Sequence, residues 1–196
     1  MAVLLCASAC SEGEAALGPA GSLGTAPTTT STTARIIDPA VIPEDLADID
    51  EAYVQVVVDA LFEVDAKATE IFVETQEVDE DAVDILRGIY LPEEVERQVN
   101  IWEQDLALRS DELLVGVLHN DVQRVIDVTE DCVYVEVRTD YSDVTTRDAP
   151  LRSIYLGLTP KIDGDDSQQV NPTSWMLFMD GLDEDESEPE NPCAGR

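Results

Sequence analysis

The chain has 196 residues, enough for one domain with tails, and its hydrophobic fraction of 44% argues against a disordered protein. It carries 43 Asp and Glu against 11 Lys and Arg, which gives a formal charge of −32. Because nucleic acids and anionic lipid surfaces are held by Lys and Arg, this charge argues against both as partners. The acidity fits adaptation to high salt, a need for solubility, or a cationic partner.

Residues 1–9 predict a signal peptide. They read MAVLLCASA, an uncharged and mostly apolar run that ends in small residues directly before Cys10. Residues 7–10, Ala-Ser-Ala-Cys, resemble the lipobox of bacterial lipoproteins. This resemblance implies cleavage before Cys10 and acylation of its thiol. We expect the full leader to begin upstream of Met1, because no basic residue precedes the apolar run; a cytosolic protein with an apolar N-terminus is the alternative.

Residues 10–42 predict a lipidated cysteine followed by a flexible linker. The linker is rich in Gly, Ala, Ser, Thr and Pro and poor in large apolar side chains, so it cannot form a core of its own. No apolar run reaches the roughly 18 residues that a membrane-spanning helix needs. We therefore expect an extracytoplasmic protein that is attached to the membrane only through Cys10. Secretion without an anchor is the alternative.

The cysteines predict a disulfide. Removal of the leader and acylation of Cys10 leave Cys132 and Cys193 as the two cysteines of the mature chain. Leftover cysteines of exported proteins usually pair, so we expect a Cys132–Cys193 bond that holds the acidic tail, residues 182–196. Two free thiols are the alternative. Two cysteines without a neighbouring histidine supply too few ligands for a metal site.

The first half of the domain reads as helical. Apolar residues recur there at steps of three and four, which places them on one face of each helix. Proline and acidic residues stand where the first and third helices begin, as expected for the positive end of a helix. The predicted helices run over 43–75, 79–88 and 92–110.

Beyond residue 111 the spacing changes to alternation, and β-branched residues become frequent. The predicted strands run over 113–128, 132–141, 152–160 and 174–181. In the second strand the alternation predicts a core face of Val133, Val135, Val137, Thr139 and Tyr141 and a solvent face of Tyr134, Glu136, Arg138 and Asp140. Helices followed by an antiparallel sheet define an α+β domain, which we place at residues 43–181.

This arrangement resembles a known superfamily. The paired strands VQRVIDVTEDCVYVEVRTDYS and the closing strand NPTSWMLFMDG, which follow the helix around Trp102, are similar to the cone-shaped superfamily of nuclear transport factor two and ketosteroid isomerase. The resemblance covers residues 44–181 and extends to variants found in bacterial envelope lipoproteins. It implies N-terminal helices packed on a curved antiparallel sheet. It also implies a conical cavity that in relatives either binds apolar small molecules or is filled by side chains.

His119 is the only histidine and is therefore the main candidate for acid/base chemistry near neutral pH. Enzymes of the superfamily place such residues inside the cone, and His119 could pair there with Asp140 or Tyr141. The sequence does not bring these residues together, so a surface or structural histidine is the alternative.

The sequence predicts no metal and no cofactor. Asp163, Asp165 and Asp166 lie in a loop that lacks the residue order of an EF-hand, which indicates a solvated loop. There is also no phosphate-binding loop and no dinucleotide-binding fingerprint.

These observations favour a non-catalytic domain in the cell envelope that binds a small apolar ligand or another envelope protein. A small-molecule isomerase or dehydratase of the same superfamily, using His119 with a carboxylate, is the alternative. A third hypothesis is an acidic accessory domain for a basic partner.

Overall fold

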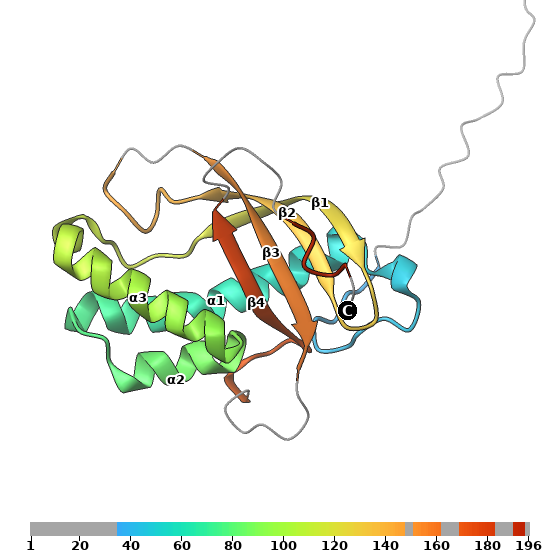
Figure 1. The fold of residues 1–196 in the computed structure, drawn as a ribbon, viewed down its shortest axis with the longest axis horizontal. Coiled ribbons are helices and arrows are strands. Elements are labelled where there is room, and N and C mark those ends of the chain that lie inside the picture. The colour runs from blue at the N-terminus through green and yellow to red at the C-terminus, as the bar shows by residue number, and fades with distance from the viewer. Residues whose placement is uncertain (1–34, 148–150, 162–168, 183–189, 195–196) are drawn as a thin grey trace, which may run out of the picture. The chain divides into compact units, whose positions relative to one another are not determined.

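The computed structural model describes residues 35–147, 151–161, 169–182 and 190–194. Among them, three α-helices precede a four-stranded antiparallel sheet whose strands lie side by side in chain order, so the predicted α+β class is confirmed (Figure 1). The helices are α1 (Glu51–Thr75), α2 (Glu80–Ile89) and α3 (Pro92–Arg109), with short 3-10 turns η1 (Leu46–Asp48) and η2 (Ser110–Glu112). The strands are β1 (His119–Val128), β2 (Val133–Asp140), β3 (Arg152–Pro160) and β4 (Trp175–Leu182).

Helix α1 begins at Glu51, later than the predicted start at residue 43. The Asp45 carboxylate accepts a hydrogen bond from the backbone N–H of Ala47 and starts only the short turn η1. Asp50 then caps α1 by accepting a hydrogen bond of 2.9 Å from the backbone N–H of Tyr53. The chain leaves helical geometry at Ile49, between the two caps. The two carboxylates therefore satisfy the free N–H groups of two separate turns instead of one continuous helix.

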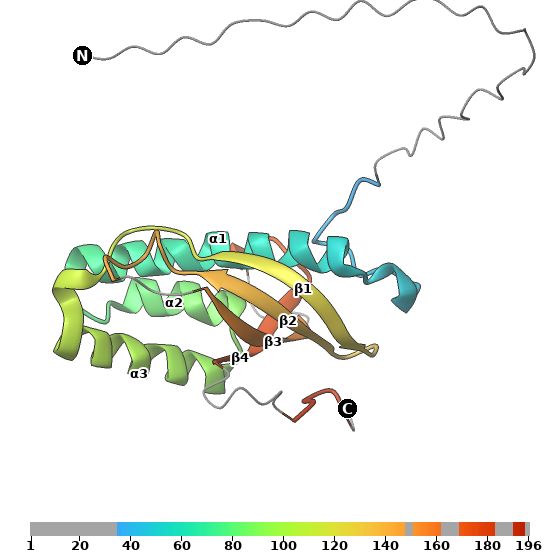
Figure 2. The same ribbon diagram turned by 90° about the horizontal axis from the view of Figure 1, so that it is seen from above.

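Helix α1 forms the centre of the core. Its first half lies along the sheet, and its second half extends past the strands and packs beside α2 and α3 (Figures 1 and 2). The apolar stripe that the sequence predicts for this helix is buried. Its buried members are Tyr53, Val54, Val57, Val58, Leu61, Phe62, Val64, Ala68 and Phe72.

Two polar side chains of α1 fasten it to the sheet. The Gln55 side chain donates to the carbonyl of Asn120 at 2.7 Å and accepts from the N–H of Val122 at 2.8 Å, so it occupies backbone groups of β1. The buried hydroxyl of Tyr53 accepts a hydrogen bond of 2.8 Å from the indole N–H of Trp175 in β4. These bonds satisfy polar groups that would be costly to leave unpaired in the core.

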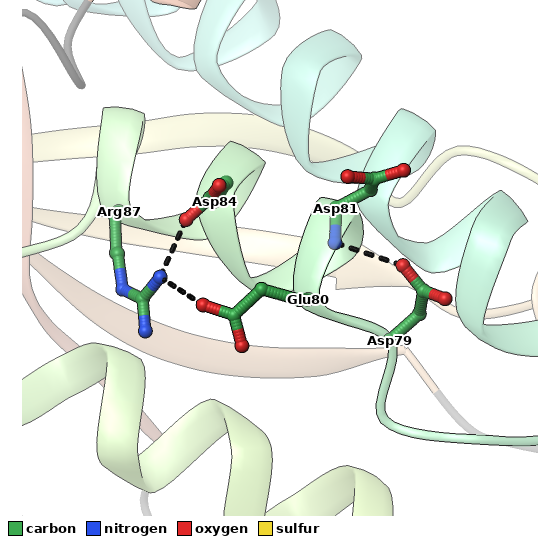
Figure 3. Close-up of polar contacts among 5 residues, drawn as sticks. All are labelled: Asp79, Glu80, Asp81, Asp84 and Arg87. Carbon is green, nitrogen blue, oxygen red and sulfur yellow. Dashed lines mark hydrogen bonds and ion pairs between the residues drawn. The ribbon is translucent and has the colours of Figure 1, made fainter.

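Helix α2 carries its charges on an exposed face (Figure 3). Asp79 caps the helix by accepting a hydrogen bond from the backbone N–H of Asp81. Arg87 forms ion pairs with Glu80 and Asp84, and these hydrogen bonds raise the pKa of Arg87. Because the three side chains are exposed, the pairs contribute little to stability.

Strand β1 begins at His119, and the prediction that it starts at residue 113 is wrong. Residues 113–118 run instead beside the loop that follows β2: Leu113 forms an isolated antiparallel bridge with Thr145, and the Leu114 N–H donates to the Val144 carbonyl. The apolar run in this segment therefore reflects packing against a loop and not pairing within the sheet.

The core face of β2 is mostly as predicted, with Val133, Val135, Val137 and Thr139 buried and Tyr141, beyond the strand's end, half-buried. The opposite face differs, because Tyr134, predicted to face solvent, is buried. It packs with Tyr155, Cys132 and Cys193 in a second apolar cluster on the outer side of the sheet. Cys193 belongs to the C-terminal segment, residues 190–194, which covers this end of the sheet (Figure 2).

The structure contains the Cys132–Cys193 disulfide that the sequence predicts. It joins the start of the β2 region to the C-terminal segment across a sequence separation of 61 residues. The segment is also held by Asn191, whose side-chain amide donates to the Asp127 carboxylate at 2.8 Å. The disulfide therefore holds residues 190–194 against Tyr134 and Tyr155.

We expect the double substitution Cys132→Ser and Cys193→Ser to lower the free energy of unfolding by up to about 4 kcal/mol. The cross-link restricts the unfolded chain over a long loop, and its loss removes that restriction. Urea unfolding of the purified domain measures the change. A thiol reductant should shift the unfolding midpoint of the wild type but not that of the double variant, and equal midpoints for the oxidised wild type and the double variant would contradict this prediction.

Candidate functional site

A cavity of about 490 Å³ lies beside the second half of α1. Its walls are α1, α3, the segment 113–118, the loop after β2 and the start of β3. This volume lies in the range of pockets that hold small molecules, which is about 300–1,000 Å³. The cavity is thus bounded by helices on one side and by the end of the sheet on the other.

Aromatic rings form the apolar wall of the cavity. Phe72, near the end of α1, stacks on Trp102 of α3 with ring centroids 4.6 Å apart and planes 10° from parallel. Phe62 and Ile154 extend this wall towards the sheet. Both stacked rings are buried, so the stack holds α1 and α3 together and also presents an apolar surface to the cavity.

Charged side chains also line the cavity. Arg97 forms an ion pair with the buried carboxylate of Glu94 one helical turn earlier. The Nε of Arg147 lies 2.5 Å from the Oε2 of Glu112. Asp65 accepts a hydrogen bond of 3.1 Å from the Tyr90 hydroxyl. Arg152 and Asp105 complete the set.

Gly116 holds one wall close to the loop after β2. A Cβ atom placed on this residue would lie 2.1 Å from the carbonyl oxygen of Asp143, far inside contact distance. Only glycine permits this approach of two backbone segments. Gly116 itself lines the cavity, so the close approach shapes that wall.

The structure separates the three residues predicted as acid/base candidates. Tyr141 lines the cavity, whereas His119 and Asp140 line another hollow, of about 320 Å³. His119 and Asp140 are cross-strand neighbours, but the imidazole Nε2 lies 2.9 Å from a different carboxylate, that of Asp143. The His119 and Asp143 side chains are 63% and 57% exposed. The arrangement is that of a polar contact at the surface and not of a group enclosed with a substrate.

The lowered pKa of Asp140 also argues against a role as a general base. Hydrogen bonds from the backbone N–H and the side chain of Ser142, with a smaller effect of His119, lower the pKa of this carboxyl. Asp140 is therefore ionised at neutral pH and is a weak base. A general base that works near neutral pH needs a raised pKa.

The charged residues of the cavity did not stand out in the sequence. Arg97, Arg147 and Arg152 are scattered over helix, loop and strand, with no motif that joins them. The one signal in the sequence is the scarcity of basic residues: the chain has only 11, so each is a candidate for a specific role.

Within the described ranges, no group of three or more His, Cys, Asp and Glu side chains is placed to hold a metal ion. No helix in the same ranges combines the length and apolar character that crossing a bilayer requires. Cys10 and the loop residues Asp163, Asp165 and Asp166 lie outside the described residues.

Comparison of the chain with protein-family models finds no match, and comparisons with curated proteins and with solved structures find no significant match.

We expect Gly116→Ala to lower the free energy of unfolding by about 1–3 kcal/mol, because the added methyl group forces two backbone segments apart. The matched control is Gly181→Ala, since a Cβ at Gly181 would meet nothing within 4 Å. Urea unfolding compares the two variants with the wild type. The interpretation fails if Gly116→Ala unfolds at the same midpoint as Gly181→Ala.

Proposed function

We propose that this domain is a non-catalytic binding module that holds a small apolar molecule in the cavity between α1, α3 and the sheet. The observation that carries the proposal is the stacked Phe72–Trp102 wall, which presents aromatic surface to a space of about 490 Å³. Contact between water and such an apolar surface is unfavourable, so an apolar ligand is favoured over water in this space.

We also propose that the domain is a member of the cone-shaped superfamily of nuclear transport factor two and ketosteroid isomerase. The order of three helices followed by an antiparallel sheet supports this assignment. The position of the cavity, between the helices and the end of the sheet, supports it as well.

The enzyme alternative, an isomerase or dehydratase, has less support. It needs His119 and a carboxylate inside a closed site, whereas His119 is exposed and pairs with exposed Asp143. The geometry therefore favours binding over catalysis.

We expect Ala66→Phe to weaken the binding of an apolar probe strongly. Ala66 is half-buried on α1 and lines the cavity, so a phenyl ring at this position takes up the space of the ligand. Titration with the neutral dye Nile red, followed by its fluorescence, should show an affinity at least about tenfold lower, which corresponds to about 1.4 kcal/mol.

The matched control for this substitution is Ala52→Phe, which adds the same ring at an exposed position in the first turn of α1. The control should bind Nile red as the wild type does. Equal affinities of Ala66→Phe and Ala52→Phe would show that the dye binds elsewhere, and the proposal would fail.

We propose, further, that the domain is held outside the cytoplasm by an acyl chain on Cys10. The residues before Cys10 support cleavage at this point. The Cys132–Cys193 disulfide supports an oxidising compartment, since such bonds persist mainly outside the cytoplasm.

We expect Cys10→Ser to move the protein from the membrane fraction to the soluble fraction when the chain is expressed with its own leader in a bacterium that processes lipoproteins. The control is Cys6→Ser, which changes a cysteine within the proposed leader and should leave the protein in the membrane fraction. Fractionation followed by immunoblotting measures the distribution. Continued membrane association of Cys10→Ser would rule out the anchor.

A further inference from the structure

We infer that the ligand of the cavity is an amphipathic anion: a molecule with an apolar chain against the Phe72–Trp102 wall and a carboxylate-type headgroup at Arg152. This inference rests on the proposed binding function and specifies the chemical class of the ligand.

The cavity gathers basic side chains of a strongly acidic chain. Acidic residues outnumber basic ones by 43 to 11 in the chain, yet three of the 11 basic side chains line this one cavity. They are Arg97, Arg147 and Arg152, and among the described residues the acidic side chains that line the cavity with them are Asp65 and Asp105. A strongly acidic protein thus gathers arginines around this cavity, and an arginine that the protein does not itself neutralise suits a negative ligand.

The three arginines differ in their partners. Arg97 is paired with Glu94, and Arg147 is paired with Glu112, so the charges of these two are balanced by the protein itself. In the described part of the chain, no carboxylate forms an ion pair with Arg152. A guanidinium group offers a planar set of donors that matches a carboxylate, and that of Arg152 is the one available for a ligand.

Arg152 lies on the same strand as Ile154, a residue of the apolar wall. Arg152 and Ile154 are two residues apart in β3, so they lie on the same face of the strand. Both line the cavity; Ile154 is buried and Arg152 is exposed. The charged group thus stands at the solvent side and the apolar surface lies further in, which is the order of headgroup and chain in an amphipathic molecule.

A neutral or cationic ligand is the competing possibility, because Asp65 and Asp105 also line the cavity. Asp65 is engaged by the Tyr90 hydroxyl. Three probes with the same ten-carbon chain separate the cases: decanoate, decanol and decyltrimethylammonium. The affinity for each probe is measured by its competition with Nile red for the full domain, followed by fluorescence at pH 7.5, where decanoate is ionised.

For the wild type we expect decanoate to compete at concentrations about five- to tenfold lower than decanol, and decyltrimethylammonium to compete least. Arg152→Gln should lower the affinity for decanoate about five- to tenfold and leave the affinity for decanol unchanged, because only the ion pair with the carboxylate is lost. Arg152→Lys should keep part of the preference for decanoate over decanol, since the positive charge remains but the planar pair of donors does not.

The matched control is Arg138→Gln. Arg138 is an exposed arginine of the neighbouring strand that lies 3.7 Å from the Asp121 carboxylate and does not line the cavity. This variant should bind all three probes as the wild type does. Circular dichroism of each variant checks that it is folded before its affinities are compared.

The outcomes separate this inference from the proposed function. Equal affinities for decanoate and decanol, no effect of Arg152→Gln on decanoate, or tightest binding of decyltrimethylammonium would overturn the anionic ligand and leave the cavity as a binding site. Competition that is unaffected by Ala66→Phe would place the probes outside the cavity and overturn both.

Discussion

The architecture depends on how helix α1 is held at its two ends. Gln55 and Tyr53 fasten its first half to β1 and β4 through hydrogen bonds, and Phe72 fastens its second half to α3 through a ring stack. The first half lies along the sheet, whereas the second half extends past the strands and packs beside α2 and α3 (Figure 2). The cavity lies where the packing changes from helix against sheet to helix against helix.

The character of the cavity follows from what each element supplies. The helices supply the aromatic wall, because Phe72 and Trp102 belong to apolar stripes that face each other. The loop after β2 and the start of β3 supply Arg147 and Arg152, at the side that is open to solvent. Helix α3 also supplies Arg97 and β3 also supplies Ile154, so each of these two elements contributes both apolar surface and positive charge.

The outer side of the sheet illustrates a different constraint. Tyr134 and Tyr155 would form an exposed apolar patch on the sheet if the C-terminal segment did not cover them. A short segment without secondary structure forms few contacts that offset the conformational entropy lost when it is ordered. The disulfide to Cys132 reduces that conformational freedom. The covalent bond therefore substitutes for the packing that a longer element would provide.

The sequence by itself determined the order of helices and strands and the core face of β2 from Val133 to Thr139, because these follow from local periodicity. The pairing of Cys132 with Cys193 was predicted on the expectation that Cys6 is removed and Cys10 acylated, and the structure contains that bond. The sequence did not determine the start of α1, which depends on two successive caps, or the start of β1, since residues 113–118 are apolar like a buried strand but pack on a loop. Only the tertiary structure decided that Tyr134 is buried, that Tyr141 and His119 line different hollows, and that Arg152 lines the same cavity as the aromatic wall. The physical reason is that each of these facts depends on how segments far apart in the chain pack together, which no local pattern of residues encodes.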